Sequence, residues 1–188
     1  MEFTISCAKP DIGTVSVSET VYDTTKPKDV VLVRTNTEVP GRLSIEKAGD
    51  FMRADKTEYF WEFVPTDVDN YEAIYGYVQI DVVDTTAPNA SISIDEHQWT
   101  LWHTVTFGLF YNENKVVTIT SADNENGSGI KETLYYVADK EMTVEELQTV
   151  QWTVYTEAFE INPDGEYVIY AKVVDNDGNI TIINSDGV

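Results

Sequence analysis

Three polar residues near the C-terminus have the types and spacing of the beginning of a calcium-binding loop. Asp175, Asp177 and Asn179 alternate with other residues, and Asp186 stands at the twelfth position of the same loop. Such loops offer the carboxylate and amide oxygens that Ca²⁺ prefers. The sixth position is Ile180, however, where the loop needs glycine for its sharp turn, and a strand pattern follows. We therefore expect a hairpin turn here, with a Ca²⁺ site as the alternative.

A second polar loop begins at Asp123. Residues 123–126 read Asp-Asn-Glu-Asn and precede a glycine, a pattern typical of turns. A calcium site that combines Asp81 or Asp84 with one of the two loops is a further alternative, although nothing in the spacing requires it. We therefore expect no cofactor, and Ca²⁺ is the one that the residues could accept.

Catalytic chemistry finds little support in the sequence. The two histidines, His97 and His103, lie outside any catalytic motif, and nucleophilic catalysis needs a base beside the nucleophile. A pair of carboxylates is not informative in a chain with 33 acidic residues. Cys7, the single cysteine, lies in a predicted strand and is expected to be a small buried thiol. We expect that the protein is not an enzyme.

Several aromatic residues of the second half could form a sugar-binding platform, because flat ring faces suit such a surface. They are Trp99, Trp102, Tyr111, Trp152 and Tyr155. Filling of the core is the competing explanation for aromatics in strands, and inward positions are also expected for Trp61, Tyr135 and Tyr167. Trp99 and Trp102 stand out because they flank a predicted turn, three residues apart, and they are the candidate ligand-binding residues.

Composition excludes several classes of partner. The 188 residues include 12 basic and 33 acidic side chains, a formal net charge of −21. Nucleic-acid binding and attraction to an anionic membrane need clustered cations, so neither is expected. No apolar stretch approaches the length of a membrane span. A hydrophobic fraction of 42% is nevertheless enough for a packed core. Because the chain has a single cysteine, no intrachain disulfide can stabilise that core.

The elements that position these residues are predicted to be strands. Runs with period-2 alternation, about ten residues apart, are typical of a β-sandwich. They cover residues 3–8, 14–18, 30–35, 42–47, 58–64 and 75–83, then 91–95, 105–111, 115–122, 132–138, 152–156, 167–174 and 180–184. One short helix is predicted after Thr143, which forms a capping box with Glu146 ahead of apolar residues at helical spacing.

The sequence predicts two domains, residues 1–83 and residues 84–188. The boundary is placed at the segment Asp-Thr-Thr-Ala-Pro over residues 84–88, because its proline ends a strand and favours an extended residue before it. Residues 1–83 carry 8 basic and 15 acidic side chains, whereas residues 84–188 carry 4 and 18. The second domain is therefore the more acidic.

Both halves resemble Ig-like domains that are repeated in bacterial cell-surface proteins and are common in gut Firmicutes. In the first half the resemblance is carried by residues 40–43 (PGRL), 59–71 (YFWEFVPTDVDNY) and 76–82 (GYVQIDV). In the second it is carried by residues 84–88 (DTTAP), 107–110 (FGLF), 127–130 (GSGI), 152–155 (WTVY), 163–172 (PDGEYVIYAK) and 175–179 (DNDGN). Asp177 departs from the pattern, since related modules carry a small residue in that turn.

The resemblance implies an all-β protein of two Ig-like β-sandwich domains in tandem, with no catalytic residues to transfer. It also implies an extracellular segment of a bacterial surface protein, attached to the cell wall through other regions. We expect a non-catalytic spacer whose partners are neighbouring Ig-like modules of the same polypeptide. An adhesin or carbohydrate-binding module is the alternative, with a surface glycan or a host protein as the ligand of the second domain.

Overall fold

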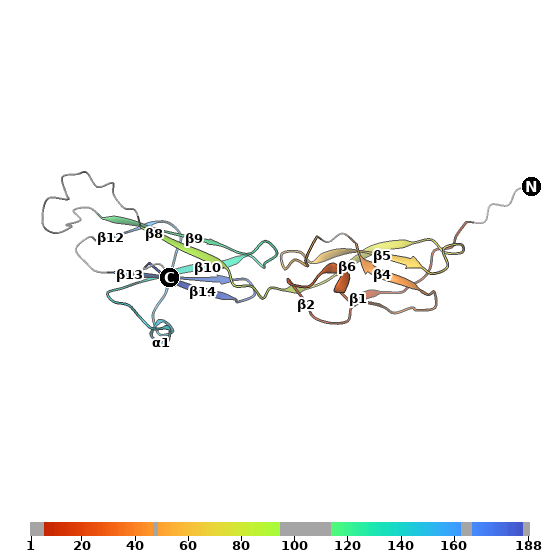
Figure 1. The fold of residues 1–188 in the computed structure, drawn as a ribbon, viewed down its shortest axis with the longest axis horizontal. Helices are drawn as coiled ribbons and strands as arrows, with labels where there is room; N and C mark the ends of the chain where they lie inside the picture. Colours follow the sequence, from red (N-terminus) through yellow and green to blue (C-terminus); the bar gives the residue numbers. More distant parts are fainter. Residues whose placement is uncertain (1–5, 47–48, 95–113, 163–166, 186–188) are drawn as a thin grey trace, which may run out of the picture. The chain divides into compact units, whose positions relative to one another are not determined.

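The computed structural model describes residues 6–46, 49–94, 114–162 and 167–185 of the chain. These residues fold into two compact units (Figure 1). The first unit comprises Met1–Thr85 with Glu125–Ser128, and the second comprises Thr86–Asn124 with Gly129–Val188. In the part of the chain that the structure describes, no helix has the length and apolar character needed to cross a membrane.

The first unit is built from short strands around one antiparallel sheet of three strands. This sheet has the order β4 (Gly41–Ile45), β5 (Glu58–Pro65), β6 (Ile74–Gln79). Two further pairs are the antiparallel β1 (Val15–Val17) with β3 (Leu32–Arg34) and the parallel β2 (Val21–Tyr22) with β7 (Val82–Val83). A 3-10 turn, η1 (Pro27–Asp29), lies between β2 and β3.

The core of the first unit depends on the alternation of side chains along β5. Tyr59, Trp61 and Phe63 point inward and are buried, while the residues between them are only partly covered. Gly76 of β6 lies opposite Trp61. A Cβ atom on Gly76 would come 2.4 Å from Cζ2 of the indole, so this position has room only for glycine. The inner face of the sheet is therefore packed around the indole of Trp61.

Within the described residues, the second unit is a β-sandwich of seven strands in two antiparallel sheets. One sheet has the order β12 (Phe159–Ile161), β9 (Lys115–Ala122), β8 (Asn89–Ile94). The other has the order β11 (Thr153–Val154), β10 (Ile130–Ala138), β13 (Val168–Asp175), β14 (Ile180–Asn184).

The two sheets of the second unit enclose a common core. Val117 and Ile119 of one sheet pack with Ile169 and Ala171 of the other, and all four are buried. In one sheet β9 lies between β8 and β12, and in the other β13 lies between β10 and β14. Counted from the start of the second unit, the second strand therefore lies between the first and the fifth, and the sixth lies between the third and the seventh, as in Ig-like sandwiches. The all-β prediction with Ig-like sandwiches and one short helix in the second unit is confirmed.

The predicted helix is α1 (Val144–Leu147), and both hydrogen bonds of its capping box are present. The backbone N–H of Glu146 donates to the Thr143 hydroxyl (3.3 Å), and the N–H of Thr143 donates to the Glu146 carboxylate (2.8 Å). Leu147 is buried in a small cluster with Ala138 and Tyr170. The helix is short because the N–H of Thr149 bonds to the carbonyl of Glu146, which tightens the last turn.

Other predictions need correction. The predicted strand 75–83 is interrupted: β6 pairs with β5, and β7 pairs with β2, so the chain changes partner at Ile80 and Asp81. The prediction of a buried thiol was wrong, because Cys7 is exposed and its Sγ lies 3.4 Å from the carbonyl oxygen of Asp69. Tyr167 is exposed rather than inward.

The remaining strands follow the sequence pattern closely, with the exception of β2 and β12, which the pattern did not indicate. The predicted strand 105–111 lies outside the described residues. Of the predicted strand 3–8, residues 6–8 are described, and Ala8 forms an isolated parallel bridge with Tyr71.

Candidate functional site

The predicted calcium-loop residues lie in the hairpin between β13 and β14. Asp175 is fully buried (0% exposed). Its Oδ1 accepts the backbone N–H of Asn179 (2.8 Å), and its Oδ2 accepts the side-chain amide of the same residue (2.8 Å). Gly178 has a φ of +92°, which the turn requires and glycine provides without strain. The predicted hairpin is confirmed, and it explains the spacing of Asp175 and Asn179.

Asp177 occupies the tip of the same hairpin and is exposed. The strand β14 begins at Ile180, immediately after Asn179, so the chain does not curve around a central ion as a calcium loop would. Asp186, the twelfth position of the loop pattern, lies outside the described residues. The hairpin therefore brings two of the four residues of the pattern together.

The loop at Asp123 meets the β13–β14 hairpin within the second unit. Asp123 accepts the backbone N–H of Asn124 through Oδ1 (2.9 Å) and that of Gly129 through Oδ2 (2.6 Å). The carbonyl of Gly129 in turn accepts the backbone N–H of Asn176 (2.9 Å) and its side-chain amide (3.1 Å). These bonds close the β9–β10 loop and attach it to the hairpin.

A carboxylate oxygen of Asp123 consequently lies within 4.8 Å of one of Asp175. Two neighbouring carboxylates are a donor set that a hard cation such as Ca²⁺ can accept. Each carboxylate of this pair also accepts two hydrogen bonds from amides, which satisfy it without an ion. The expectation of no cofactor, with Ca²⁺ as the alternative at Asp175, Asp177 and Asn179 or at Asp123, stays a prediction.

The predicted sugar platform lies mainly outside the described residues. Trp99, Trp102 and Tyr111 lie outside the described residues, as do both histidines. Trp152 and Tyr155 are partly buried, and the Tyr155 hydroxyl accepts the backbone N–H of Ile119 (3.0 Å). Trp152 and Tyr155 therefore belong to the packing of the second unit rather than to an open platform.

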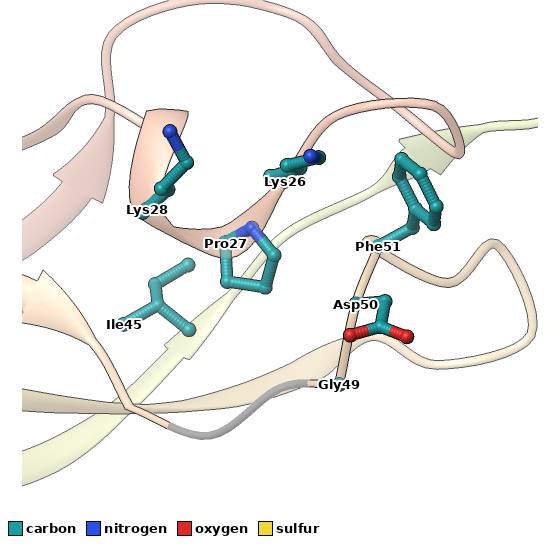
Figure 2. Close-up of a pocket in the computed structure, with 7 residues that line it drawn as sticks. All are labelled: Lys26, Pro27, Lys28, Ile45, Gly49, Asp50 and Phe51. Carbon is teal, nitrogen blue, oxygen red and sulfur yellow. The ribbon is translucent and has the colours of Figure 1, made fainter.

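One pocket of the first unit has a volume of about 550 Å³ (Figure 2). Its lining combines cationic, acidic and apolar side chains, from Lys26, Pro27, Lys28, Ile45, Gly49, Asp50 and Phe51. Lys26 and Lys28 are exposed; the ammonium group of Lys26 lies 5.8 Å from the ring centre of Phe51, and that of Lys28 lies 3.3 Å from Asp29 Oδ1. Both cations thus already have a partner at the surface.

The outward side of β5 and β6 forms an aromatic face, defined here as Phe60, Tyr75 and Tyr77. The rings of Phe60 and Tyr75 are stacked, with centres 5.7 Å apart and planes 11° from parallel. The ring of Tyr77 meets Phe60 edge-on at 5.3 Å. Tyr75 and Tyr77 are 54% and 64% exposed, so much of both rings is open to solvent.

An acidic side chain is part of the same surface. Glu62 lies directly opposite Tyr75 in the register of β5 and β6. Its hydrogen bond with the Tyr75 hydroxyl raises the pKa of that tyrosine above its usual value. The sequence pattern did not identify this surface, although the alternation of Tyr75 and Tyr77 in a predicted strand was a signal that could have indicated it.

No family model and no curated protein matches the chain. A solved structure of Clostridium thermocellum CbhA fibronectin(III)-like modules aligns with 91% of this chain and 91% of its own, at 16% identity and a TM-score of 0.29. The Ig-like character of the second unit is therefore argued from its own strand order.

Proposed function

We propose that this chain is a non-catalytic spacer of a bacterial cell-surface protein, which holds more distal domains away from the cell. The observation that carries the proposal is the linker between the units, Asp84–Pro88. It is short, and each of its ends is fastened by a side-chain hydrogen bond inside the unit to which that end belongs.

At the first end, the carboxylate of Asp23 holds Thr85. Asp23 is 4% exposed, and its Oδ1 accepts both the hydroxyl (2.9 Å) and the backbone N–H (3.3 Å) of Thr85. Hydrogen bonds to a buried charged acceptor are among the stronger ones in proteins. Thr85, which ends the Met1–Thr85 segment of the first unit, is therefore attached to the loop after β2.

At the second end, the hydroxyl of Thr181 in β14 donates to the carbonyl of Pro88, whose ring is buried. The proline ring fixes its own φ and restricts Ala87 to extended conformations. Only Thr86 and Ala87 stand between the two attachment points. Such a linker has few bonds about which it can bend, and a spacer needs that property.

The polar loops of the second unit support the same function. Asp123 and Asp175 close turns by accepting hydrogen bonds from backbone amides. These two carboxylates, which could otherwise belong to a catalytic or metal site, thus have a structural role. The net charge of −21 would make neighbouring copies at a cell surface repel one another. The expected partners of this chain are the adjoining Ig-like modules of the same polypeptide.

The spacer function can be tested by pulling the full chain from its two ends in a single-molecule force measurement. We expect two separate unfolding events, each releasing roughly 300 Å of chain, because an extended residue spans about 3.5 Å. The variant Phe63→Ala, which opens the core of the first unit, should weaken one event and leave the other unchanged. Smooth extension without unfolding events would contradict the spacer function.

The carbohydrate-binding alternative rests on Trp99 and Trp102. Because both residues lie outside the described part of the chain, the structure adds no observation in its favour. It stays a prediction of the sequence.

A further inference from the structure

We propose that the aromatic face of the first unit binds a basic, extended segment of another polypeptide through its lysine or arginine side chains. This binding site is additional to the spacer function and does not depend on it. The proposal rests on the exposure of the rings, on the charges around them, and on the way this chain places its own cations on aromatic rings.

The exposure of the two tyrosines is the first observation. Tyr75 and Tyr77 are alternate residues of β6 and lie on one side of the sheet, with Phe60 beside them. Both rings are more than half exposed. Contiguous exposed aromatic surface marks interaction sites, and tyrosine is enriched among the residues that dominate binding energy at protein interfaces.

The charges around the rings are the second observation. Glu62 lies opposite Tyr75, Glu58 lies opposite Gln79, and the N–H of Glu46 bonds to the carbonyl of Phe60. Among the residues of β4, β5 and β6, the positively charged side chain is that of Arg42. It pairs with Val64, which lies two residues after Glu62 in β5. The charges nearest the rings are therefore negative, which disfavours an acidic partner and favours a basic one.

The third observation is that cations of this chain already lie on its aromatic rings. Arg34 lies 4.5 Å from the ring centre of Phe63, and Lys56 lies 4.8 Å from that of Tyr59. Lys172 approaches Trp152 in the second unit at 5.9 Å. A cation attracted to the ring of Tyr75 would in addition meet the carboxylate of Glu62, so the aromatic face offers both kinds of attraction together.

The geometry favours an extended polypeptide over a small molecule. Small ligands bind in concave sites, whereas these side chains project from a sheet face, and the pocket of Figure 2 is lined by other residues. Alternate side chains of an extended strand are about 7 Å apart on one side. Tyr75 and Tyr77 have this same relation along β6, so lysines at alternate positions of a partner strand match their spacing.

The test uses the full chain and a synthetic peptide in which lysine and serine alternate. The matched control peptide has norleucine in place of each lysine. Affinity is measured by calorimetry, and the bound surface is mapped by the amide shifts of the labelled protein. We expect binding of the lysine peptide, with the largest shifts at Phe60, Tyr75 and Tyr77.

Variants separate the aromatic face from general attraction to an acidic protein. The double variant Tyr75→Ala with Tyr77→Ala keeps the charge of the chain and should weaken binding about tenfold, the loss of two exposed cation–π contacts. The control double variant Tyr22→Ala with Tyr167→Ala removes two other exposed tyrosines and should bind as the unchanged chain does. Glu62→Gln should weaken binding a few-fold, on the order expected for an exposed charge pair.

The double variant Tyr75→Ala with Tyr77→Ala should keep its circular dichroism spectrum, because both side chains project into solvent. Equal affinity of this variant and the unchanged chain would overturn the proposal, since binding would then follow charge alone. A neutral oligosaccharide such as maltohexaose that shifts the same amides, where the lysine peptide does not, would also overturn it. Neither result would bear on the force measurement that tests the spacer function.

Discussion

The hydroxyl of Tyr59 shows how single side chains stabilise the first unit. It donates to the carbonyl of Arg53 (2.8 Å) and accepts the N–H of the same residue (2.9 Å), while its ring is buried in the core. Burial raises the pKa of Tyr59 above its usual value, so the phenol stays neutral and can donate. One side chain thus joins the core to the loop before β5.

Tyr59→Phe should lower the free energy of unfolding by about 1–3 kcal/mol, because the backbone groups of Arg53 would lose their buried partner. Urea denaturation of the full chain measures the change. The matched control Tyr77→Phe removes an exposed hydroxyl and should change stability by less than about 0.5 kcal/mol. Equal effects of the two variants would show that the hydroxyl of Tyr59 has no special role.

The pair of Glu62 and Tyr75 gives a second prediction at this scale. The hydrogen bond to Glu62 raises the pKa of Tyr75. Glu62→Gln should therefore shift the titration of this tyrosine toward lower pH, which NMR of its labelled ring carbon can follow. A titration that does not move would contradict the contact on which the aromatic face partly depends.

Residue types alone could predict part of this arrangement. The turn at Gly178 and the partnership of Asp175 with Asn179 follow from local turn chemistry. The aromatic face does not, because β5 carries aromatic side chains on both of its sides, with Phe60 outward and Trp61 inward. Which side of β5 faces the core depends on where a neighbouring strand leaves space for the indole of Trp61. That space comes from Gly76 in β6.

At the scale of elements, α1 depends on its capping box. Thr143→Ala should lower the free energy of unfolding by about 1 kcal/mol, because the N–H of Glu146 would lose its acceptor. Thr143→Ser keeps the hydroxyl and is the matched control. Thermal unfolding of both variants measures the difference, and an alanine variant as stable as the serine variant would exclude a role for the cap.

The same cap makes the helix sensitive to acid. The backbone N–H of Thr143 lowers the pKa of Glu146, with a smaller contribution from Lys140. A lowered pKa means that the stabilisation is complete above the pKa of the unfolded chain and is lost as the pH falls through the folded value. The stability difference between the unchanged chain and Glu146→Gln should therefore shrink on acidification. A difference that is constant with pH would contradict this assignment.

The elements were predictable where a local signal existed. The capping box identified α1, and alternation identified most strands, because both signals lie within a few residues. The change of partner between β6 and β7 depends on β2, which is distant in sequence and only two residues long. Cys7 was assigned to a buried strand for the same reason, since an isolated bridge to Tyr71 cannot be read from local pattern.

The whole molecule consists of two Ig-like units joined by a linker whose two ends are held by side-chain hydrogen bonds. Without an intrachain disulfide, each unit depends on its own core, around β5 in the first and between the two sheets in the second. The acidic composition disfavours nucleic acid as a partner, and in the proposed binding at the aromatic face the acidic residues have a specific use. Composition could not indicate the linker bonds, because Asp23 and Thr85 are 62 positions apart in the chain.

The attachment of the linker can be loosened by removing one hydrogen-bond acceptor at its first end and one donor at its second end. Asp23→Ala removes the acceptor of Thr85, and Thr181→Val removes the donor to Pro88. Asp23→Asn and Thr181→Ser each keep an oxygen that can make the same bond, and they are the matched controls. We expect the linker to be more flexible in the double variant Asp23→Ala with Thr181→Val. In the double variant Asp23→Asn with Thr181→Ser, the linker should be as stiff as in the unchanged chain.

The distribution of distances between the two units measures the stiffness of the linker, on which the spacer function depends. Spin labels at the exposed Cys7 and at Ser93→Cys, on an exposed position of β8, place one probe in each unit. We predict a narrow distribution for the chain with its natural linker and a broad one for Asp23→Ala with Thr181→Val. If the natural linker gives a distribution as broad as that of the double variant, the chain is not a stiff spacer.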